Sequence, residues 1–530
     1  MKKILFCGAA LLLLAGCQNK SEKLETALEQ MELSTSGKGR TTYSDKSVSG
    51  DQVVLENVVI DTTGIGERIE STLEGAENFN IVTDLYSSNI QVKKLTFDGL
   101  KMDADNRAIF ENVLFEGLKI VPIEDPEAVG LYVENMKLEG TSPELSAWLA
   151  AMFQKKSDVK APKPDKLTFK SLKMDGLVWL DEDLPVEHAS TLKSLKIEDV
   201  KDDKVGALSL EGLKVKFFDA YSPEPGEFSI ADLNLKGSNV AFLQAAQEKD
   251  PFASASDISK SVLQTPLDDG IDEAQLKDLE FALDGVELKL PELKYSVERN
   301  TSGMPLSSRL EPVNLSFKAD PEAGLLGAQL SPYLSAYGVD DLKITTGYSS
   351  TYDPKTDLAQ TKDSYIEVEN AFRLSYDFSG SGVKKLQEKL QSVDPDLVLS
   401  GEKSAKDVMA DLYSELDIHA LTMTLEDQGA VNKLVALAAI MRGLSPDDVR
   451  KSVNGIMAFG MVGALMLGVD EGILQEFGDA SRGFIEKGGT VTLSMTPTEP
   501  VSLSTLMDKP SQVKKDTLGF SMIHTPPEAE

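Results

Sequence analysis

Few side chains in this sequence have the types and spacing that chemistry requires. The three histidines, His188, His419 and His524, are too far apart for the i, i+4 pair that binds a metal on one helix. The S-x-x-K spacing recurs in the chain, for example at Ser157, Ser190 and Ser400. No S-D-N or K-T-G accompanies it, and so many serines and lysines produce such matches by chance. Residues 378–382, FSGSG, lack the order of a nucleophile elbow. We therefore predict no catalytic residue, no cofactor and no metal site.

Two acidic clusters are the remaining candidates for binding chemistry. They occupy residues 181–183 and 268–273. Carboxylates at this density can hold Ca²⁺ weakly, but neither cluster fits the twelve-residue loop of an EF-hand. We assign both to solvated turns.

Cys17 has the clearest chemistry in the chain. Lys2 and Lys3 precede an apolar run over residues 4–14, and the run closes in Leu-Ala-Gly-Cys17. Small residues mark the cut of a secretory signal, and a cysteine directly after the cut supplies a thiol for a diacylglycerol. The pattern resembles the bacterial lipobox, which implies a signal peptide over residues 1–16 and lipidation of Cys17. A transmembrane anchor is the alternative, but this run is too short to span about 30 Å of hydrocarbon as a helix.

Lipidation at Cys17 would decide where the chain resides. Two or more acyl chains, such as palmitate, anchor a protein stably to a membrane. Cys7 is the only other cysteine and leaves with the signal, so the mature chain is expected to contain no disulfide. The resemblance implies a periplasm-facing protein of the bacterial envelope, and Gln18 after the cysteine favours the outer membrane over the inner one.

The charge balance argues against a nucleic-acid partner. The chain carries 86 acidic and 54 basic residues, a formal net charge of −32. Phosphate binding depends on clustered lysine and arginine. The acids are spread through the sequence, which is typical of a solvated surface. A cationic partner is the alternative.

An eight-residue pattern with apolar residues at positions 1, 3, 6 and 8 recurs along the chain. Copies begin at Val53, Leu95, Val113, Leu131, Leu167, Leu208, Phe228, Phe281 and Leu416. Each half alternates like a strand with one buried face, yet the halves are out of phase by one residue. A β-bulge would keep both halves on one face, and the central Gly of several copies accepts positive φ. A tight hairpin turn is the alternative, but better turn sequences lie between the copies.

The spacing of the copies predicts the architecture. Those at Leu95, Val113 and Leu131 start 18 residues apart, which fits a long strand plus a short turn and therefore antiparallel neighbours. Apolar stripes with helical spacing follow glycines at four places, namely Gly140, Gly237, Gly380 and Gly429. We predict an α+β fold of repeated antiparallel β-meanders, each followed by a helix that packs on the sheet.

These features divide the chain into segments. After the signal we expect a lipidated flexible tether over 17–50 with a short helix near 24–31, repeats over 51–250 and a second β-rich region over 251–427. A helical cap over 428–488, a closing strand within 489–507 and a loosely ordered tail over 508–530 follow. Residues 452–469 carry no charge. We expect a helix buried against a sheet there, with a lipid-contacting cap or a membrane span as alternatives.

The repeated pattern, the long meanders and the N-terminal membrane attachment together resemble AsmA-like and YdgA-like envelope proteins. The similarity extends over residues 50–500, although those families are usually anchored by a transmembrane helix. It implies a non-enzymatic role, structural or in lipid handling, through an apolar sheet face that shields acyl chains. The alternatives are a scaffold that docks another envelope protein and, last, a hydrolase that uses paired carboxylates.

Overall fold

The chain folds into two compact units, residues Met1–Lys249 and Asp250–Glu530. The computed structural model describes residues 23–62, 88–122, 130–155, 159, 162, 166–180, 188–201, 204–217, 225–239, 271–301, 303–337, 339, 341–392, 412, 414–508 and 510–527. Both units are mainly antiparallel β-sheet, and the second adds a C-terminal helical region, a combination compatible with the α+β class. The predicted boundary between residues 250 and 251 falls outside the described residues.

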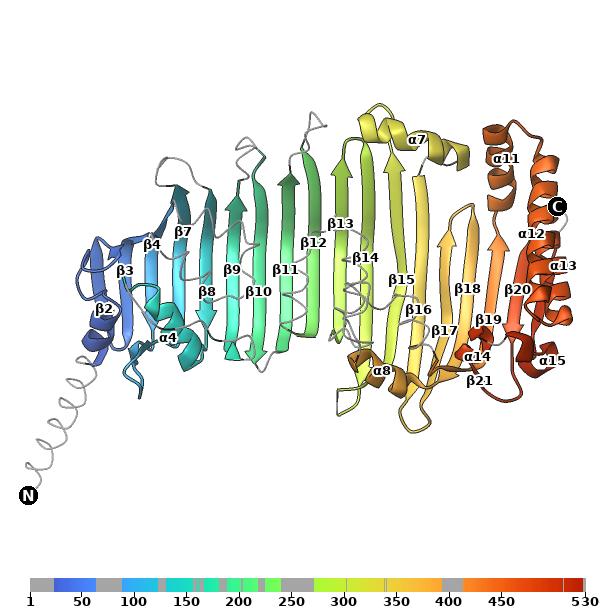
Figure 1. Cartoon of the computed structure of the whole chain (residues 1–530). Helices are drawn as coiled ribbons and strands as arrows, with labels where there is room; N and C mark the ends of the chain where they lie inside the picture. The colour runs from blue at the N-terminus through green and yellow to red at the C-terminus, as the bar shows by residue number, and fades with distance from the viewer. Residues whose placement is uncertain are drawn as a thin grey trace, which may run out of the picture. The chain divides into compact units, whose positions relative to one another are not determined.

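The sheet of the first unit is a meander whose strands follow one another in chain order (Figure 1). Two short strands, β1 (Thr41–Thr42) and β2 (Asp45–Ser49), pair with the outer side of β3. The further strands are β3 (Gln52–Asp61), β4 (Ser88–Asp98), β7 (Asn112–Pro122), β8 (Leu131–Glu139), β9 (Phe169–Trp179), β10 (Ser190–Lys201), β11 (Lys204–Phe217) and β12 (Gly226–Asn239). A small hairpin of β5 (Lys101–Met102) and β6 (Ala108–Ile109) extends the β4–β7 pair.

The half-step in the eight-residue pattern is a kink inside a continuous strand. In β3, Val53, Leu55, Val58 and Ile60 are all buried, so both halves of the pattern face the same side. The kink lies at Asn57, whose φ is +50°. The expectation that the apolar residues share one face is confirmed here.

The kink differs from the predicted β-bulge in one respect. A bulge sets two residues against one, whereas the β3–β4 ladder passes from Glu56–Lys94 to Val58–Val92 and skips one residue on each strand, Asn57 and Lys93. The register is therefore unchanged across the kink. The same paired skip recurs at this level through β12, with positive φ at Gly117, Gly176 and Gly212.

A second line of left-handed residues crosses the same sheet, directly after the ends of β4 and β8 and inside β10 and β12. Gly99, Gly140, Asp199 and Gly237 have φ between +52° and +71°. The glycines are required where the strands approach closely, since a Cβ at Gly140 would lie 2.7 Å from the Cβ of Lys170. Because the kinks align from strand to strand, every strand changes phase at the same level.

Aligned kinks give the sheet one continuous apolar face. A transverse row of paired residues runs through Val58, Val92, Leu118, Val133, Leu177, Leu192, Leu213 and Ile230. Two parallel rows, also wholly hydrophobic, start at Leu55 and Val53 and end at Leu233 and Leu235. We call these three rows the apolar face.

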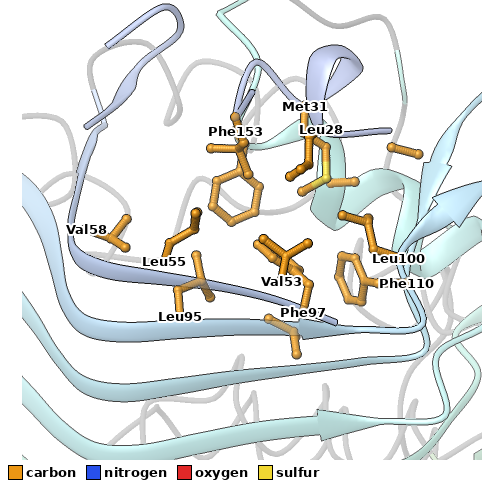
Figure 2. Packing of buried hydrophobic residues seen from close by; sticks show 14 of the residues in the cluster. Leu28, Met31, Val53, Leu55, Val58, Leu95, Phe97, Leu100, Phe110 and Phe153 are labelled. Carbon is orange, nitrogen blue, oxygen red and sulfur yellow. The ribbon is translucent and has the colours of Figure 1, made fainter. Parts of the chain in front are cut away.

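Two helices cover the β3–β8 end of the apolar face. Residues 23–30 are helical, and Leu24, Leu28, Met31 and Leu33 are at most 2% exposed. Figure 2 shows Leu28 and Met31 over Val53, Leu55 and Phe97. The short helix was predicted, but the prediction of a flexible tether was wrong from residue 23 onward, because this segment packs on the sheet. The segment is polar in composition, yet its few apolar residues have helical spacing and bury one side of it.

The second unit has its own antiparallel meander (Figure 1). Its strands are β13 (Glu273–Leu283), β14 (Val286–Arg299), β15 (Pro305–Ala319), β16 (Asp341–Asp353), β17 (Leu358–Val368), β18 (Phe372–Ser381), β19 (Asp417–Asp427), β20 (Thr490–Met495), β21 (Val501–Ser502) and β22 (Ser521–Thr525). The strands pair in chain order from β13 to β20, and β22 adds to β20. Two helices, α7 (Leu325–Tyr337) and α8 (Val383–Ser392), lie at opposite ends of the strands.

One copy of the pattern does not form a kink. In the copy that begins at Phe281, Asp284 and Gly285 make a two-residue turn between β13 and β14, with φ of +48° and +82° and Leu283 paired with Val286. The predicted bulge was wrong here. The start of α7 makes the difference, because the Asp284 carboxylate accepts the N–H of Leu326 at 2.8 Å and so fixes the turn.

The C-terminal region contains the predicted helices and a more ordered end than expected. The helices are α11 (Ala430–Arg442), α12 (Pro446–Met466) and α13 (Glu471–Lys487). Residues 452–469 were expected to form a helix buried against a sheet, but α12 packs on α11 and α13, and Phe459 is 83% exposed. Helix α14 (Leu503–Asp508) ends where the predicted tail begins. The tail itself was predicted to be loose, but η4 (Pro510–Gln512), α15 (Lys515–Leu518) and β22 belong to the fold. Val513, Leu518 and Phe520 are buried, because Leu493 and Met495 of β20 pack against them.

We expect the kink glycines to be required for stability. Replacing Gly176 (φ +64°, Cβ position 2.8 Å from the Cβ of Glu134) by Val should lower the free energy of unfolding by roughly 2–4 kcal/mol, through left-handed strain and a clash. Gly176→Asn should cost less, since Asn57 occupies the equivalent position. Chemical denaturation measures both.

Gly50 provides the matched control. Its φ is +67°, but no described atom lies within 4 Å of a Cβ built there. Gly50→Val should therefore cost only the strain, about 1–2 kcal/mol. Equal losses at the two positions would contradict the close approach of strands at the kink.

Candidate functional site

A pocket of about 320 Å³ opens between the apolar face and helix α4 (Pro143–Ala151). Every residue that lines it is hydrophobic. They are Ile60, Ile90, Phe97, Phe110, Val113, Phe115, Leu118, Met136, Leu138, Leu149, Met152, Phe153 and Leu172. The pocket is thus built by strands β3 to β9 and by one side of the α4 segment.

Helix α4 is held over the sheet by hydrogen bonds at its start. Ser142 is the N-cap and accepts the N–H of Leu145 at 3.3 Å, and Pro143 follows at the first helical position. The buried Ser146 hydroxyl accepts the N–H of Phe110 at 2.6 Å, and the Thr141 hydroxyl donates to the Phe110 carbonyl at 2.7 Å. Phe110, which lines the pocket, is therefore fixed through both of its backbone groups.

Three phenylalanines that line the pocket contact one another. Phe97 lies 5.3 Å from Phe110 and 5.5 Å from Phe153 between ring centroids, the latter edge to face (Figure 2). Such pairs are worth about 0.5–1.5 kcal/mol beyond the area they bury. The helical stripe that holds Leu149, Met152 and Phe153 was predicted from the sequence, and these three side chains form the α4 wall.

The N-terminal helix closes the other side of this core. The Gln30 side chain donates to the Asn106 carbonyl at 2.6 Å and accepts the N–H of Ala108, both in the β5–β6 hairpin. The Glu32 carboxylate accepts the N–H of Lys155, just beyond α4, at 3.0 Å. The two helical segments and the hairpin therefore form one cover.

The hairpin loop is stabilised by Asp103. Its carboxylate accepts the N–H groups of Asp105 and Arg107 and pairs with the Arg107 guanidinium at 2.7 Å. Burial of Asp103 opposes its ionisation, but these hydrogen bonds and the arginine charge outweigh it and hold the pKa below its usual value.

The opposite face of the sheet is charged. Lys94 and Glu116 pair across strands at 2.8 Å, and Lys173 and Asp175 pair along one strand at 2.8 Å. The hydrogen bond to Glu116 raises the pKa of Lys94. Charges therefore lie on one side of the sheet and hydrocarbon on the other, which suits the pocket to an apolar guest.

Beyond α4 the apolar face continues over β9 to β12. Its residues there are mostly half-buried, among them Met174, Leu195, Leu210 and Leu233. Trp179 is half-buried too and pairs with Leu131 and Ser190. The pocket is therefore one end of a longer hydrophobic surface.

The predicted lipidation site Cys17 lies outside the described residues, as do the acidic cluster 181–183 and residues 268–270 of the second cluster. Asp272 of that second cluster pairs with Arg299 at 2.5 Å. Within the described ranges no three His, Cys, Asp or Glu residues could hold a metal ion together.

The serine and lysine of the Ser190 pair have other partners. Ser190 accepts the N–H of Lys216, while Lys193 pairs with Glu211. The pairs that begin at Ser157 and Ser400 involve residues beyond the described ranges.

One serine–histidine contact was missed by sequence reasoning. His419 is half-buried, and its Nε2 lies 2.8 Å from the Ser381 hydroxyl. No sequence signal predicted it, because the two residues meet only through the β18–β19 pairing. In the described part of the chain no carboxylate is hydrogen-bonded to the His419 ring.

The surroundings of Ser381 have a structural role. The N–H groups of Gly382 and Lys384 donate to the Asp357 carboxylate at 3.0 and 3.2 Å, which caps helix α8. Tyr352 donates to the same carboxylate at 2.9 Å, and burial together with this acid raises the Tyr352 pKa to about 12. The Gly382 amide is thus unavailable to stabilise an oxyanion.

Comparison with known proteins gives little functional information. A family model described only as "Uncharacterized protein" matches residues 365–524, within the second unit. A search of curated proteins returned no match. Within the described residues, no helix combines the length and hydrophobicity needed to cross a membrane.

The bond between Ser146 and Phe110 offers a test of how α4 is held. Ser146→Ala should leave the buried Phe110 N–H without its partner and cost about 1–3 kcal/mol in free energy of unfolding. Glu144→Ala, on the exposed side of the same helix, is the control and should cost less than half as much. Thermal or denaturant unfolding distinguishes the two, and equal effects would contradict the assigned contact.

Proposed function

We propose that this chain is a bacterial envelope lipoprotein, anchored through Cys17, that binds an acyl chain or similar apolar guest on the apolar face of its first unit. The observation that supports this proposal best is the pocket of about 320 Å³ without a polar lining residue. Ligand pockets commonly measure about 300–1,000 Å³. The absence of polar lining groups favours hydrocarbon over a headgroup.

An empty pocket of this kind would be costly. Protein interiors are normally close-packed, and a closed apolar void costs about 24 cal/mol per Å³, on the order of 8 kcal/mol for this volume. Because the pocket is open to solvent, the free-energy cost of leaving it empty is smaller than this. A cost still exists, because water in the pocket gains no hydrogen bonds from these walls. A guest that buries apolar surface recovers about 0.8 kcal/mol for each methylene.

The shape of the surface favours a long guest. The three rows of the apolar face continue from the pocket strands to β12, so a chain that enters under α4 can extend along them. A stacked aromatic or a sugar would find hydrogen-bonding groups only on the other, charged face. The alternative function is a scaffold that docks another envelope protein. A lipid-free protein with one stoichiometric partner would favour that alternative.

Ligand binding is tested with variants of Met136, a pocket residue of β8. Met136→Glu places a charge in the pocket and should weaken binding of a fluorescent fatty acid by at least tenfold. Met136→Trp should fill the pocket, lower probe binding and raise Tm. A variant that was merely destabilised could lose probe binding, but its Tm would fall instead of rising. Fluorescence titration and thermal unfolding measure the two effects.

Asn135→Glu is the matched control. Asn135 is the chain neighbour of Met136 and belongs to the charged face, where it pairs with Asp175. This variant should bind the probe like the unchanged protein. Undiminished binding to both Met136 variants would contradict the proposed site.

The anchor has its own test. Intact-mass analysis of the membrane fraction should find a mature N-terminus at Cys17 that carries acyl groups, and Cys17→Ser should leave the uncut, unacylated precursor. A mature protein that starts at another residue, or an unmodified Cys17, would refute lipid anchoring and leave the pocket proposal standing.

A further inference from the structure

The pocket beside α4 is closed at one end by aromatic rings. Phe97, Phe110 and Phe153 line the pocket and are at most 6% exposed. Leu28 and Met31 pack in the same core as these rings, yet neither lines the pocket (Figure 2). The N-terminal segment therefore fills the space on the far side of the rings. We call Phe97, Phe110 and Phe153 the end wall.

The strands beneath the pocket show the same asymmetry. Val53 and Leu55 of β3 and Leu95 of β4 belong to the rows of the apolar face, but they are 0% exposed and do not line the pocket. Met136 of β8 and Leu172 of β9, further along the rows, line it and are half-buried. Burial along the rows thus decreases from β3 toward β9, and the room for a longer guest lies in that direction.

The end wall offers no hydrogen bond to a polar group. Its side chains are hydrocarbon, and the backbone groups of Phe110 are already bonded, the N–H to the Ser146 hydroxyl and the carbonyl to the Thr141 hydroxyl. A hydroxyl or carboxylate pressed against this wall would lose its hydrogen bonds to water without gaining others. The methyl end of an acyl chain has no hydrogen bonds to lose, and it gains contacts with three rings.

The other end of a bound chain would lie in a different environment. Beyond Leu172 the described residues of the apolar face are mostly half-buried, as at Leu195 and Leu210. A polar group held beyond β9 keeps its water, so it needs no partner in the protein. The two ends of an acyl lipid are therefore suited to opposite ends of this surface.

We propose that the pocket takes an acyl chain methyl end first, with that end against the end wall and the polar group in water beyond β9. This inference rests on the proposed function and adds selectivity to it. The end wall rejects a chain with a polar or bulky substituent at its methyl end, whereas the chemistry of the other end has little effect. The expected guests are therefore lipids with unsubstituted acyl chains, and Phe97, Phe110 and Phe153 determine that specificity.

Competition against a fluorescent fatty acid on the purified full chain tests this selectivity. The competitors are a fatty acid, the same acid with a hydroxyl on its terminal carbon, and a lysophospholipid with the same acyl chain. The terminal hydroxyl should weaken competition by about tenfold or more, whereas the change of polar group should alter it far less. Equal weakening by both changes, or a stronger effect of the polar group, would overturn the orientation. If none of the three competes, the proposed function itself is wrong, and this inference falls with it.

Phe153→Ala tests the position of the end wall through a gain of binding. The change leaves an apolar cavity at the wall, and such cavities bind small aromatic molecules. A fatty acid that ends in a phenyl group should therefore bind Phe153→Ala about tenfold more tightly than it binds the unchanged chain, because the ring buries its apolar surface there. Phe153→Val leaves a smaller cavity and should change binding in the same direction. The same competition experiment measures both.

Leu172→Ala is the matched control. Leu172 lines the pocket at β9, away from the end wall, so a cavity there should not favour the phenyl-ended acid over the unsubstituted one. Loss of folding cannot produce tighter binding, so a gain at Phe153→Ala alone supports the end wall. No gain at Phe153→Ala, or an equal gain at Leu172→Ala, would overturn the proposed orientation.

Discussion

The structure of the first unit depends on the alignment of its strand kinks. A regular strand alternates its side chains between two faces, so the repeated pattern would otherwise send half of its leucines to each side. At each kink the strand ladder skips a left-handed residue on one strand and the residue opposite it on the next, as at Gly176 and Glu134. Because each strand skips one residue, the pairing register is unchanged. The phase change is therefore shared by all the strands, and the apolar residues form one surface. The pocket exists because that surface is continuous.

The architecture was largely predictable from the sequence, since the apolar spacing requires an extended chain with one hydrophobic side. A helix in the position of α4 was equally predictable, because an apolar stripe with helical spacing follows Gly140. The kind of kink was not predictable. A bulge and a paired skip place the same residues on the same face, and they differ only in what the neighbouring strand does. Asp284–Gly285 illustrates the limit, because a contact with α7 decides between kink and turn there.

The candidate site was predictable only in part. The sequence indicated an apolar face and the α4 stripe, but nothing in it located a pocket between them, because that depends on how far α4 is held from the sheet by Ser146 and Thr141. The sequence predicted the helix over residues 23–30 but not its packing on the sheet, since charged residues surround Leu24 and Leu28. The Ser381–His419 contact joins residues 38 positions apart and left no local signal.

Photo-crosslinking in living cells tests whether the kink turns apolar residues on both of its sides to one lipid-binding face. A photoreactive amino acid would replace Met174, Asp175 or Leu177, which flank the kink at Gly176 on β9. We expect lipid adducts from positions 174 and 177 and none from 175, because the kink turns the first two to the apolar face and Asp175 to the charged one. Adducts from only one of the two apolar positions would contradict the shared face. Equal adducts from all three, or from none, would contradict lipid binding there.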